Sequence, residues 1–144
     1  MSESIYQVTP ESFISNLSLH LKSNQIITQP PNISILKTSH AKQLPPTNTD
    51  WIFVRASSII RSMLINISCS KYTSISLLAN KYGCSKNRGC RPSRKVRASL
   101  HPIQWILKDL EKKGWVVKCE KGRTLSEECV KEMGQLIEKI KNNE

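Results

Sequence analysis

Seven lysine and arginine side chains are gathered in the seventeen residues 81–97, and phosphate binding is the chemistry that they could perform. The longer stretch 51–108 holds 11 of the 22 basic residues and no Asp or Glu, so the rest of the chain, with 11 basic and 11 acidic residues, has no net charge. A compact protein that gathers unpaired positive charge destabilises itself by self-repulsion, so a polyanion is the natural counterpart. The charge pattern favours nucleic acid as the partner.

Within this stretch, residues 86–97 are predicted to form an extended basic loop. They show no apolar period, and they contain two turn signals, Asn87-Arg88-Gly89 and Pro92-Ser93. A flexible, solvated charge run is the ordinary interpretation of such a segment. The turn residues give it a fixed shape, however, and no carboxylate nearby compensates its charge, so phosphate binding is the favoured interpretation.

The five cysteines do not have the spacing of a metal site. Cys84 and Cys90 are separated by five residues, and Cys119 and Cys129 by nine. Zinc ligands usually come in pairs about two to four residues apart. The histidines are scattered, so free thiols, no metal and no cofactor are expected.

Catalytic and membrane-spanning patterns are also absent from the sequence. The glycines form neither a GxxxxGK loop nor a GxGxxG turn, and residues 51–108 offer no carboxylate for acid–base work. Polar residues interrupt the longest apolar region, residues 59–67, and the first thirty residues show no secretory signal. We therefore expect no enzyme, no small-molecule substrate and no membrane partner.

The elements that would position the basic residues are mostly helical. Apolar spacing predicts helices over residues 10–22, 51–65 and 74–82, then one that begins at Ser99 or His101 and ends at Gly114, and a last one after Ser126. Thr9, Asp50 and Ser126 are expected N-caps. Residues 115–125 are predicted to be a β-hairpin, with a glycine in its turn.

Buried and exposed faces follow from the same spacing. Ile60, Leu107 and Leu110 fall on apolar stripes, and Trp51 is expected in the core. Trp105 lies off its stripe, which leaves base stacking and a protein neighbour as equal interpretations. The helix, loop, helix, hairpin, helix order predicts a mainly α fold, a single winged-helix-like domain over residues 1–144 with a small β-hairpin wing and an additional N-terminal helix.

Five segments share a family pattern in order and spacing. Residues 51–61 (WIFVRASSIIR) have a Trp…Arg-Ala-Ala/Ser-Ser…Arg helix, residues 81–83 a Tyr-Gly pair, residues 88–93 (RGCRPS) an Asn-Gly-x-x-Pro-Ser-like loop, residues 107–111 (LKDLE) a leucine-rich helix end, and residues 122–126 (GRTLS) a Gly-Arg-x-Leu-Thr-like wing closure. Phe13, Leu21-Lys22 and Leu44-Pro45-Pro46 fit in order too. The chain thereby resembles the nineteen-e family of small-subunit ribosomal proteins of eukaryotes and archaea.

This resemblance implies a structural protein in the head of the small ribosomal subunit. Its partners would be the ribosomal RNA and neighbouring ribosomal proteins, and it would take part in maturation of the small-subunit RNA. It would act on cytoplasmic ribosomes, with a nucleolar assembly stage in a eukaryote. From the family pattern and the charges together, the residues expected to bind RNA are Arg55, Arg61, Lys81, Lys86, Arg88, Arg91, Arg94, Lys95, Arg97, Lys121 and Arg123.

The chain departs from the family in three places. Residues 66–73 contain no glycine where relatives have a glycine-rich run, Asn32 replaces a tryptophan, and Gln104 and Trp105 lie where relatives are basic. The chain therefore resembles a fast-diverging member, in which the loop after Ile65 and the outer face of the helix around Ile103 are not expected to contact RNA as in relatives.

Two other functions compete with the ribosomal one. A winged-helix DNA-binding regulator would need base-reading side chains on the outer face of the helix around Ile103. The outward set there is a poor reader: Gln104, Trp105, Lys108, Glu111 and Lys112. A protein–protein adaptor that uses the mixed-charge C-terminal helix would leave the basic stretch 51–108 unexplained.

Overall fold

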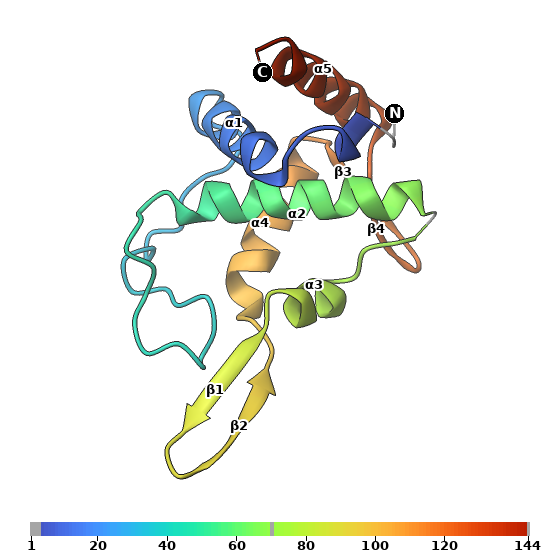
Figure 1. The fold of residues 1–144 in the computed structure, drawn as a ribbon. Coiled ribbons are helices and arrows are strands. Elements are labelled where there is room, and N and C mark those ends of the chain that lie inside the picture. The colour runs from blue at the N-terminus through green and yellow to red at the C-terminus, as the bar shows by residue number, and fades with distance from the viewer. Residues whose placement is uncertain (1–3, 70, 144) are drawn as a thin grey trace.

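The structure, a computed structural model that describes residues 4–69 and 71–143, is built around one long central helix (Figure 1). Its elements are η1 (Ser4–Tyr6), α1 (Pro10–Ser23), α2 (Trp51–Ser68), α3 (Ile75–Lys81), β1 (Cys84–Arg88), β2 (Arg91–Val96), α4 (Leu100–Lys112), β3 (Val116–Cys119), β4 (Gly122–Leu125) and α5 (Glu127–Asn143). Helix α2 packs against α1, α4 and β4, while α3 packs against α4 and α5 packs against α1. The mainly α, winged-helix-like fold expected from the sequence is confirmed.

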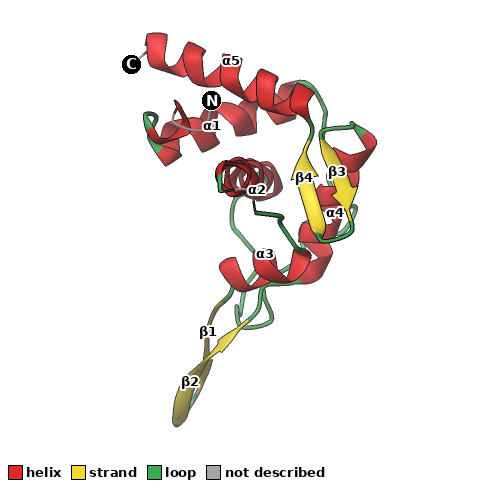
Figure 2. Ribbon diagram, turned by 90° about the vertical axis from the view of Figure 1, so that its right-hand side faces the viewer, coloured by secondary structure: helices red, strands yellow, loops and turns green. Residues whose placement is uncertain are grey.

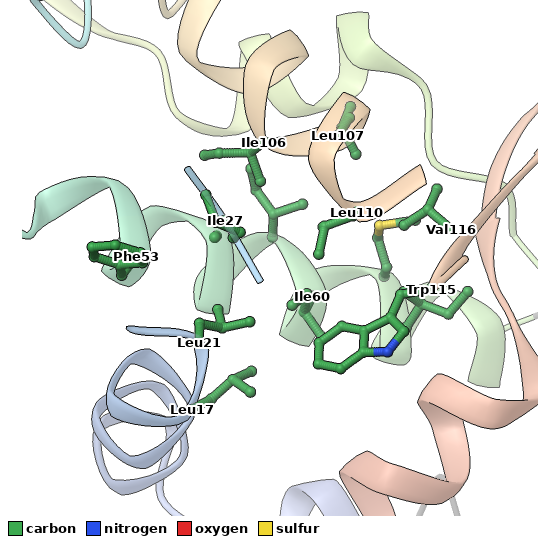
Figure 3. Packing of buried hydrophobic residues seen from close by; sticks show 14 of the residues in the cluster. Leu17, Leu21, Ile27, Phe53, Ile60, Ile106, Leu107, Leu110, Trp115 and Val116 are labelled. Carbon is green, nitrogen blue, oxygen red and sulfur yellow. The ribbon is translucent and has the colours of Figure 1, made fainter. Parts of the chain in front are cut away.

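Helix α2 is central because its apolar stripe is unusually wide. Ile52, Ala56, Ile59, Ile60 and Met63 are fully buried at steps of three and four residues, so different sides of the helix meet different neighbours. The helix runs three residues beyond the predicted end at residue 65. In Figure 3, side chains of α1, α2 and α4 and of the wing meet in one cluster.

The expected core residues are confirmed. Ile60, Leu107 and Leu110 are at most 1% exposed, and Trp51 is 8% exposed. Trp115, at the start of the wing, is also buried, at 2%. Burial of this many large apolar side chains against one helix is the main favourable term in folding.

The expected helix starts are confirmed, with one difference. Thr9 Oγ1 accepts a hydrogen bond from Ser12 N at 3.3 Å, and Ser126 Oγ accepts one from Cys129 N at 3.4 Å. Asp50 does occupy the N-cap position of α2, but its side chain makes no capping bond. Its carboxylate instead accepts from Lys22 Nζ at 2.6 Å, because that charged partner on α1 lies within reach.

Gly114 ends α4 as expected, and Gly83 follows α3 for a different reason. Gly114 has φ +79°, and the amides of Gly114 and Trp115 donate to the carbonyls of Glu111 and Leu110, which is the Schellman arrangement. Gly83 has no positive φ. A Cβ there would lie 2.6 Å from the Val96 carbonyl oxygen, so close packing against β2 excludes a side chain.

The predicted wing hairpin is confirmed. Strands β3 and β4 pair antiparallel from Val116 opposite Leu125 to Cys119 opposite Gly122. A further bridge joins Thr73 to Arg123, with both of its hydrogen bonds at 3.0 Å. Thr73, between α2 and α3, thus pairs with the wing as a short third strand, as expected for a winged-helix arrangement.

The basic segment is not the extended loop predicted from the sequence, because it forms a second antiparallel hairpin, β1–β2. Its turn is fixed by Asn87 Oδ1, which accepts from Gly89 N at 2.9 Å, and by Gly89 at φ +74°. Both faces of this hairpin are largely exposed. Its sequence therefore lacks the apolar alternation that normally reveals a strand.

No helix within the described residues is long and apolar enough to cross a membrane.

Candidate nucleic-acid interface

The β1–β2 hairpin projects from one end of the molecule. In Figures 1 and 2 it extends away from the helical body below α3, while α5 lies at the opposite end. Arg88, Arg91, Arg94 and Lys95 on this hairpin are exposed, and Lys86 is half-buried. Arg97, directly after β2, is exposed as well. The structure therefore brings six of the expected site residues together on one projection.

Positive side chains face each other directly across this hairpin. Lys86 pairs with Arg94, and Arg88 pairs with Arg91, in the strand register. Like charges opposite each other destabilise a strand pair, by a few tenths to about 1 kcal/mol each. No Asp or Glu occurs between residues 51 and 108 to offset this repulsion. The positive charges of the hairpin therefore have no compensating negative charge within residues 51–108.

The base of the hairpin is tied to the body. Ala98 N donates to Ala79 O on α3 at 2.9 Å, and Ser39 Oγ donates to Arg97 O at 3.1 Å. At the same end of the hairpin, the residue before β1, Gly83, packs closely against Val96 at the end of β2, as described above. These contacts aim the hairpin in one direction, although its tip is free of contact with the core.

Arg55 is held against α3 instead of extending into solvent. Its guanidinium carbon lies 4.2 Å from the centroid of the Tyr82 ring, and the Tyr82 hydroxyl is 2.8 Å from Ser58 Oγ. Burial lowers the pKa of Arg55, although a guanidinium stays protonated at neutral pH. Burial also raises the pKa of Tyr82, against the opposing effects of the Ser58 hydrogen bond and the Arg55 charge.

Arg61 and Lys81 form a second cationic cluster one and a half turns further along α2. Lys81 Nζ donates to Ser62 Oγ at 2.7 Å. Burial lowers the pKa of Lys81, and the positive charge of Arg61, which precedes Ser62 in the chain, lowers it further. Among the described residues, no group accepts a hydrogen bond from the buried Nε of Arg61. Lys81 ends α3 and β1 begins three residues later, so this cluster adjoins the base of the hairpin along the chain.

The wing residues are in a different electrostatic situation. Lys118 and Arg123 are cross-strand partners, but both bind Glu111 of α4, at 3.0 and 2.7 Å. Burial opposes ionisation of Glu111, yet the hydrogen bonds from Arg123 and Lys118 outweigh it and hold the pKa of its carboxyl below the usual range. Arg123 thus serves to dock the wing on α4, and Lys121 alone of the two expected wing contacts is exposed.

Sequence reasoning missed the polar contacts that hold the long segment 24–50. Asp109, only 6% exposed, accepts from Thr28 N at 3.0 Å and from Thr28 Oγ1 at 2.7 Å. Trp105 Nε1 donates to Thr28 O at 2.8 Å, which gives this side chain a partner within the protein. The sequence did offer a signal for these contacts, because Asp109 lies within an otherwise apolar stripe and a buried charge is normally paired.

The cysteines do not converge in the structure. No group of three or more possible metal ligands is found within residues 4–69 and 71–143. Cys129 is buried, and burial followed by the Glu132 charge raises the pKa of its thiol to about 12. A thiol in that state is a packing group.

Fold and surface together define a winged-helix-like, mainly helical protein with a strongly cationic projection. The chain belongs to the family described as Ribosomal protein S19e, whose sequence model matches residues 4–143. The resemblance to this family is thereby confirmed. Membership in a family of ribosomal proteins also agrees with the expectation that the chain is not an enzyme.

Relatives from eukaryotes and archaea cover most of the chain. Small ribosomal subunit protein eS19 of Encephalitozoon cuniculi is 34% identical over 139 residues, 92% of this chain and 98% of its own. The protein of the same name from Thermoplasma acidophilum is 34% identical over 123 residues, 85% of this chain and 79% of its own. Small ribosomal subunit protein eS19B of Schizosaccharomyces pombe is 30% identical over 142 residues, 98% of this chain and 96% of its own.

Proposed function

We propose that this protein is a structural constituent of the small ribosomal subunit and binds ribosomal RNA chiefly through the β1–β2 hairpin. The names of its relatives support the ribosomal role. The observation that carries the RNA contact is the pairing of Lys86 with Arg94 and of Arg88 with Arg91, with no carboxylate to separate them. A row of phosphates would supply the missing negative charge.

The contrast between the two hairpins supports this assignment. In the wing, the cross-strand cations Lys118 and Arg123 share the carboxylate of Glu111, which offsets part of their repulsion. In β1–β2, the equivalent repulsion is left in place on an exposed surface. Arginine suits such a surface because its planar guanidinium can bind phosphate oxygens with two parallel hydrogen bonds.

The proposed RNA-binding residues divide into three groups. The hairpin and its base supply Lys86, Arg88, Arg91, Arg94, Lys95 and Arg97. Arg61 and Lys81 extend this surface along α2. Arg55 packs on Tyr82 and so helps to position the hairpin. Lys121 would be a separate contact at the wing turn, while Arg123 acts through its ion pair with Glu111.

The finer parts of the ribosomal role are proposals as well. The protein would lie in the subunit head, contact neighbouring ribosomal proteins there and assist maturation of the small-subunit RNA. It would work on cytoplasmic ribosomes, after a nucleolar assembly stage if the cell is eukaryotic. We further propose that the chain acts as one domain, in keeping with the single cluster of buried residues found in the part of the chain that the structure describes.

A DNA-binding regulator is a poorer fit to the outer face of α4. Trp105 donates its indole N–H to Thr28, and Glu111 is engaged by two cations of the wing. These side chains are therefore committed within the protein and are not available to read base edges.

Sucrose-gradient cosedimentation tests the proposal. The Arg88→Ala, Arg91→Ala, Arg94→Ala variant should be largely absent from small-subunit fractions at moderate salt, whereas the wild type enters them. The matched control removes three exposed lysines elsewhere, Lys42→Ala, Lys113→Ala, Lys139→Ala, and should enter normally. Normal entry of the hairpin variant would overturn the hairpin assignment, and failure of the wild type to enter would overturn the ribosomal role.

A further inference from the structure

An apolar groove runs between the end of α2 and the first three turns of α5. One part of it, about 310 Å³, is lined by Ile5, Leu64, Ile67, Val130, Met133 and Ile137. The next part, about 520 Å³, is lined by Ile67, Tyr72, Leu125 and Val130, and also by the exposed residues Lys71 and Lys131, whose side is called the mouth of the groove below. Ile67 and Val130 line both parts, so the two hollows are adjacent, and together they are called the groove below.

Several apolar side chains of the groove are partly exposed to solvent. Leu64, Ile67 and Val130 are only partly buried, and Tyr72 is 45% exposed. Single exposed apolar side chains are ordinary on a protein surface, but a contiguous concave patch is typical of an interaction site.

The loop after α2 fixes the mouth of this groove. Lys71 N donates to Asn66 O at 2.8 Å, and Asn66 Nδ2 donates to Thr73 Oγ1 at 2.9 Å. On the other side of the loop, the wing turn at Gly122 packs against Tyr72, where a Cβ would lie 3.2 Å from Tyr72 Cβ. Lys71 and Tyr72 are thus placed at the mouth by contacts on either side of them.

Charge distinguishes this end of the molecule from the hairpin end. Helix α5 and the hairpin β1–β2 lie at opposite ends in both views (Figures 1 and 2). Residues 109–144, which include β4 and α5, contain eight basic and eight acidic residues and have no net charge. The charged residues in the groove lining are Lys71, Lys131 and Glu127, too little net positive charge to hold a polyanion, so the aliphatic lining favours a polypeptide occupant over RNA.

We propose that this groove binds a segment of a partner protein that presents aliphatic side chains and, beside them, at least one carboxylate. The aliphatic side chains would fill the space along Ile67 and Val130. The carboxylate follows from the two lysines at the mouth, since neither Lys71 nor Lys131 forms an ion pair with a described carboxylate. Glu127 at the same edge limits the positive charge there, so a peptide with one or two acids suits it better than a phosphate chain.

This proposal goes beyond the RNA-binding role and rests on separate residues. The protein would be bipolar, with the hairpin on RNA and the groove on a neighbouring protein. A ribosomal protein that bridges RNA and protein neighbours would need two such surfaces.

Photo-crosslinking from position 72 tests the groove. The full-length chain with Tyr72→benzoylphenylalanine is expressed in cells and irradiated, and adducts are sorted by protease and ribonuclease sensitivity and then sequenced. The expected product is an adduct to one protein, at a segment that carries both aliphatic and acidic residues. An RNase-sensitive adduct, an adduct to a second copy of this chain, or no adduct would overturn the proposal.

Charge reversal tests the role of the two lysines. In the Lys71→Glu, Lys131→Glu background the adduct should fall on the order of tenfold or more, because like charges brought together at an interface repel each other. The equal charge change at exposed positions elsewhere, Lys113→Glu, Lys139→Glu, should leave the yield unchanged. An undiminished adduct in the first background would overturn the carboxylate assignment. Subunit entry measured on the same lysates tests the ribosomal role independently of the crosslink.

Discussion

The guanidinium carbon of Arg55 lies over the ring of Tyr82, 4.2 Å from its centroid, and so joins α2 to the residue that follows α3. Tyr82 is followed directly by Gly83, whose close approach to Val96 closes the base of the β1–β2 hairpin. Arg55 therefore helps to position the base of the hairpin through its contact with Tyr82. An arginine in the basic stretch has a structural task as well as a charge.

The first prediction concerns this pair. Arg55→Lys keeps the charge but loses the planar group that covers the ring, so the free energy of unfolding should fall by about 0.5–2 kcal/mol. Tyr82→Phe keeps the ring and removes the bond to Ser58, which should cost about 0.5–1.5 kcal/mol. Urea unfolding of each variant measures both values. Arg55→Lys with wild-type stability would show that the stacked geometry contributes nothing.

The second prediction concerns salt. Each phosphate neutralised lowers the log–log slope of RNA affinity against salt by about 0.7–0.9. If the hairpin supplies the contacts, the Arg88→Ala, Arg91→Ala, Arg94→Ala variant should lose about 2–3 units of slope relative to the wild type. Filter binding to small-subunit RNA between low and moderate salt measures this difference. Equal slopes would mean that these side chains do not touch phosphate.

Local signals in the sequence were sufficient for most of the helical frame. Thr9 and Ser126 were recognisable as N-caps, and the apolar steps of α2 and α4 identified Ile60, Leu107 and Leu110 as core residues. These features depend on residues within one or two turns of each other, so no knowledge of the tertiary structure is needed to find them.

Features that depend on distant partners escaped sequence reasoning. The β1–β2 hairpin has no buried face, so its strands carry no alternating pattern. The pairing of Arg123 with Glu111 and of Asp109 with Thr28 depends on how the wing and the segment 24–50 pack on α4. The charge pattern alone identifies the basic cluster. The structure was needed to show which of its side chains are exposed and which are paired within the protein.

A third prediction follows from the buried carboxylate. Burial works against the charge of Asp109, but the hydrogen bonds from Thr28 and Lys112 outweigh it and hold the pKa of its carboxyl below the usual range. A depressed folded-state pKa contributes stability that is fully present above the unfolded pKa, near 3.9, and is lost as pH falls through the folded value.

Asp109→Asn tests this dependence. At pH 7 the variant should lose about 1.5–3 kcal/mol, since it gives up hydrogen bonds to a charged acceptor. The difference from the wild type should narrow as the pH falls below about 4, because the wild-type carboxyl also becomes neutral. Thermal melting at a series of pH values gives the result. A gap of constant size down to pH 2 would contradict the assignment.

A fourth prediction separates folding from binding. Leu107 is 1% exposed, so Leu107→Ala should cost about 2–5 kcal/mol of stability. The Arg88→Ala, Arg91→Ala, Arg94→Ala variant should melt at or slightly above the wild-type temperature, since it relieves like-charge repulsion between β1 and β2. Thermal melting of both beside gradient cosedimentation makes the comparison. A hairpin variant that melts early would assign these arginines to folding.

The last prediction comes from two helix ends with the same geometry and different residues. Helix α1 ends in the Schellman arrangement, in which Gln25 N and Ile26 N donate to Lys22 O and Leu21 O. Helix α4 ends in the same way at Gly114. Gln25 has φ +48° and Gly114 has φ +79°, so both lie in the left-handed region, but only glycine enters that region without strain.

Reciprocal substitutions at these two positions should therefore have opposite signs. Gln25→Gly relieves a left-handed strain of about 1–2 kcal/mol and loses part of that to the greater freedom of the unfolded chain, for a net gain of about 0.5–1 kcal/mol. Gln25 is exposed, so little packing is lost with its side chain. Gly114→Ala should lose a similar amount, and because no atom lies within 4 Å of the added Cβ, that loss is purely conformational. Urea unfolding of both variants measures the pair of changes. If Gln25→Gly is destabilising while Gly114→Ala behaves as expected, then the side chain of Gln25 makes a favourable contribution that outweighs the strain of its backbone.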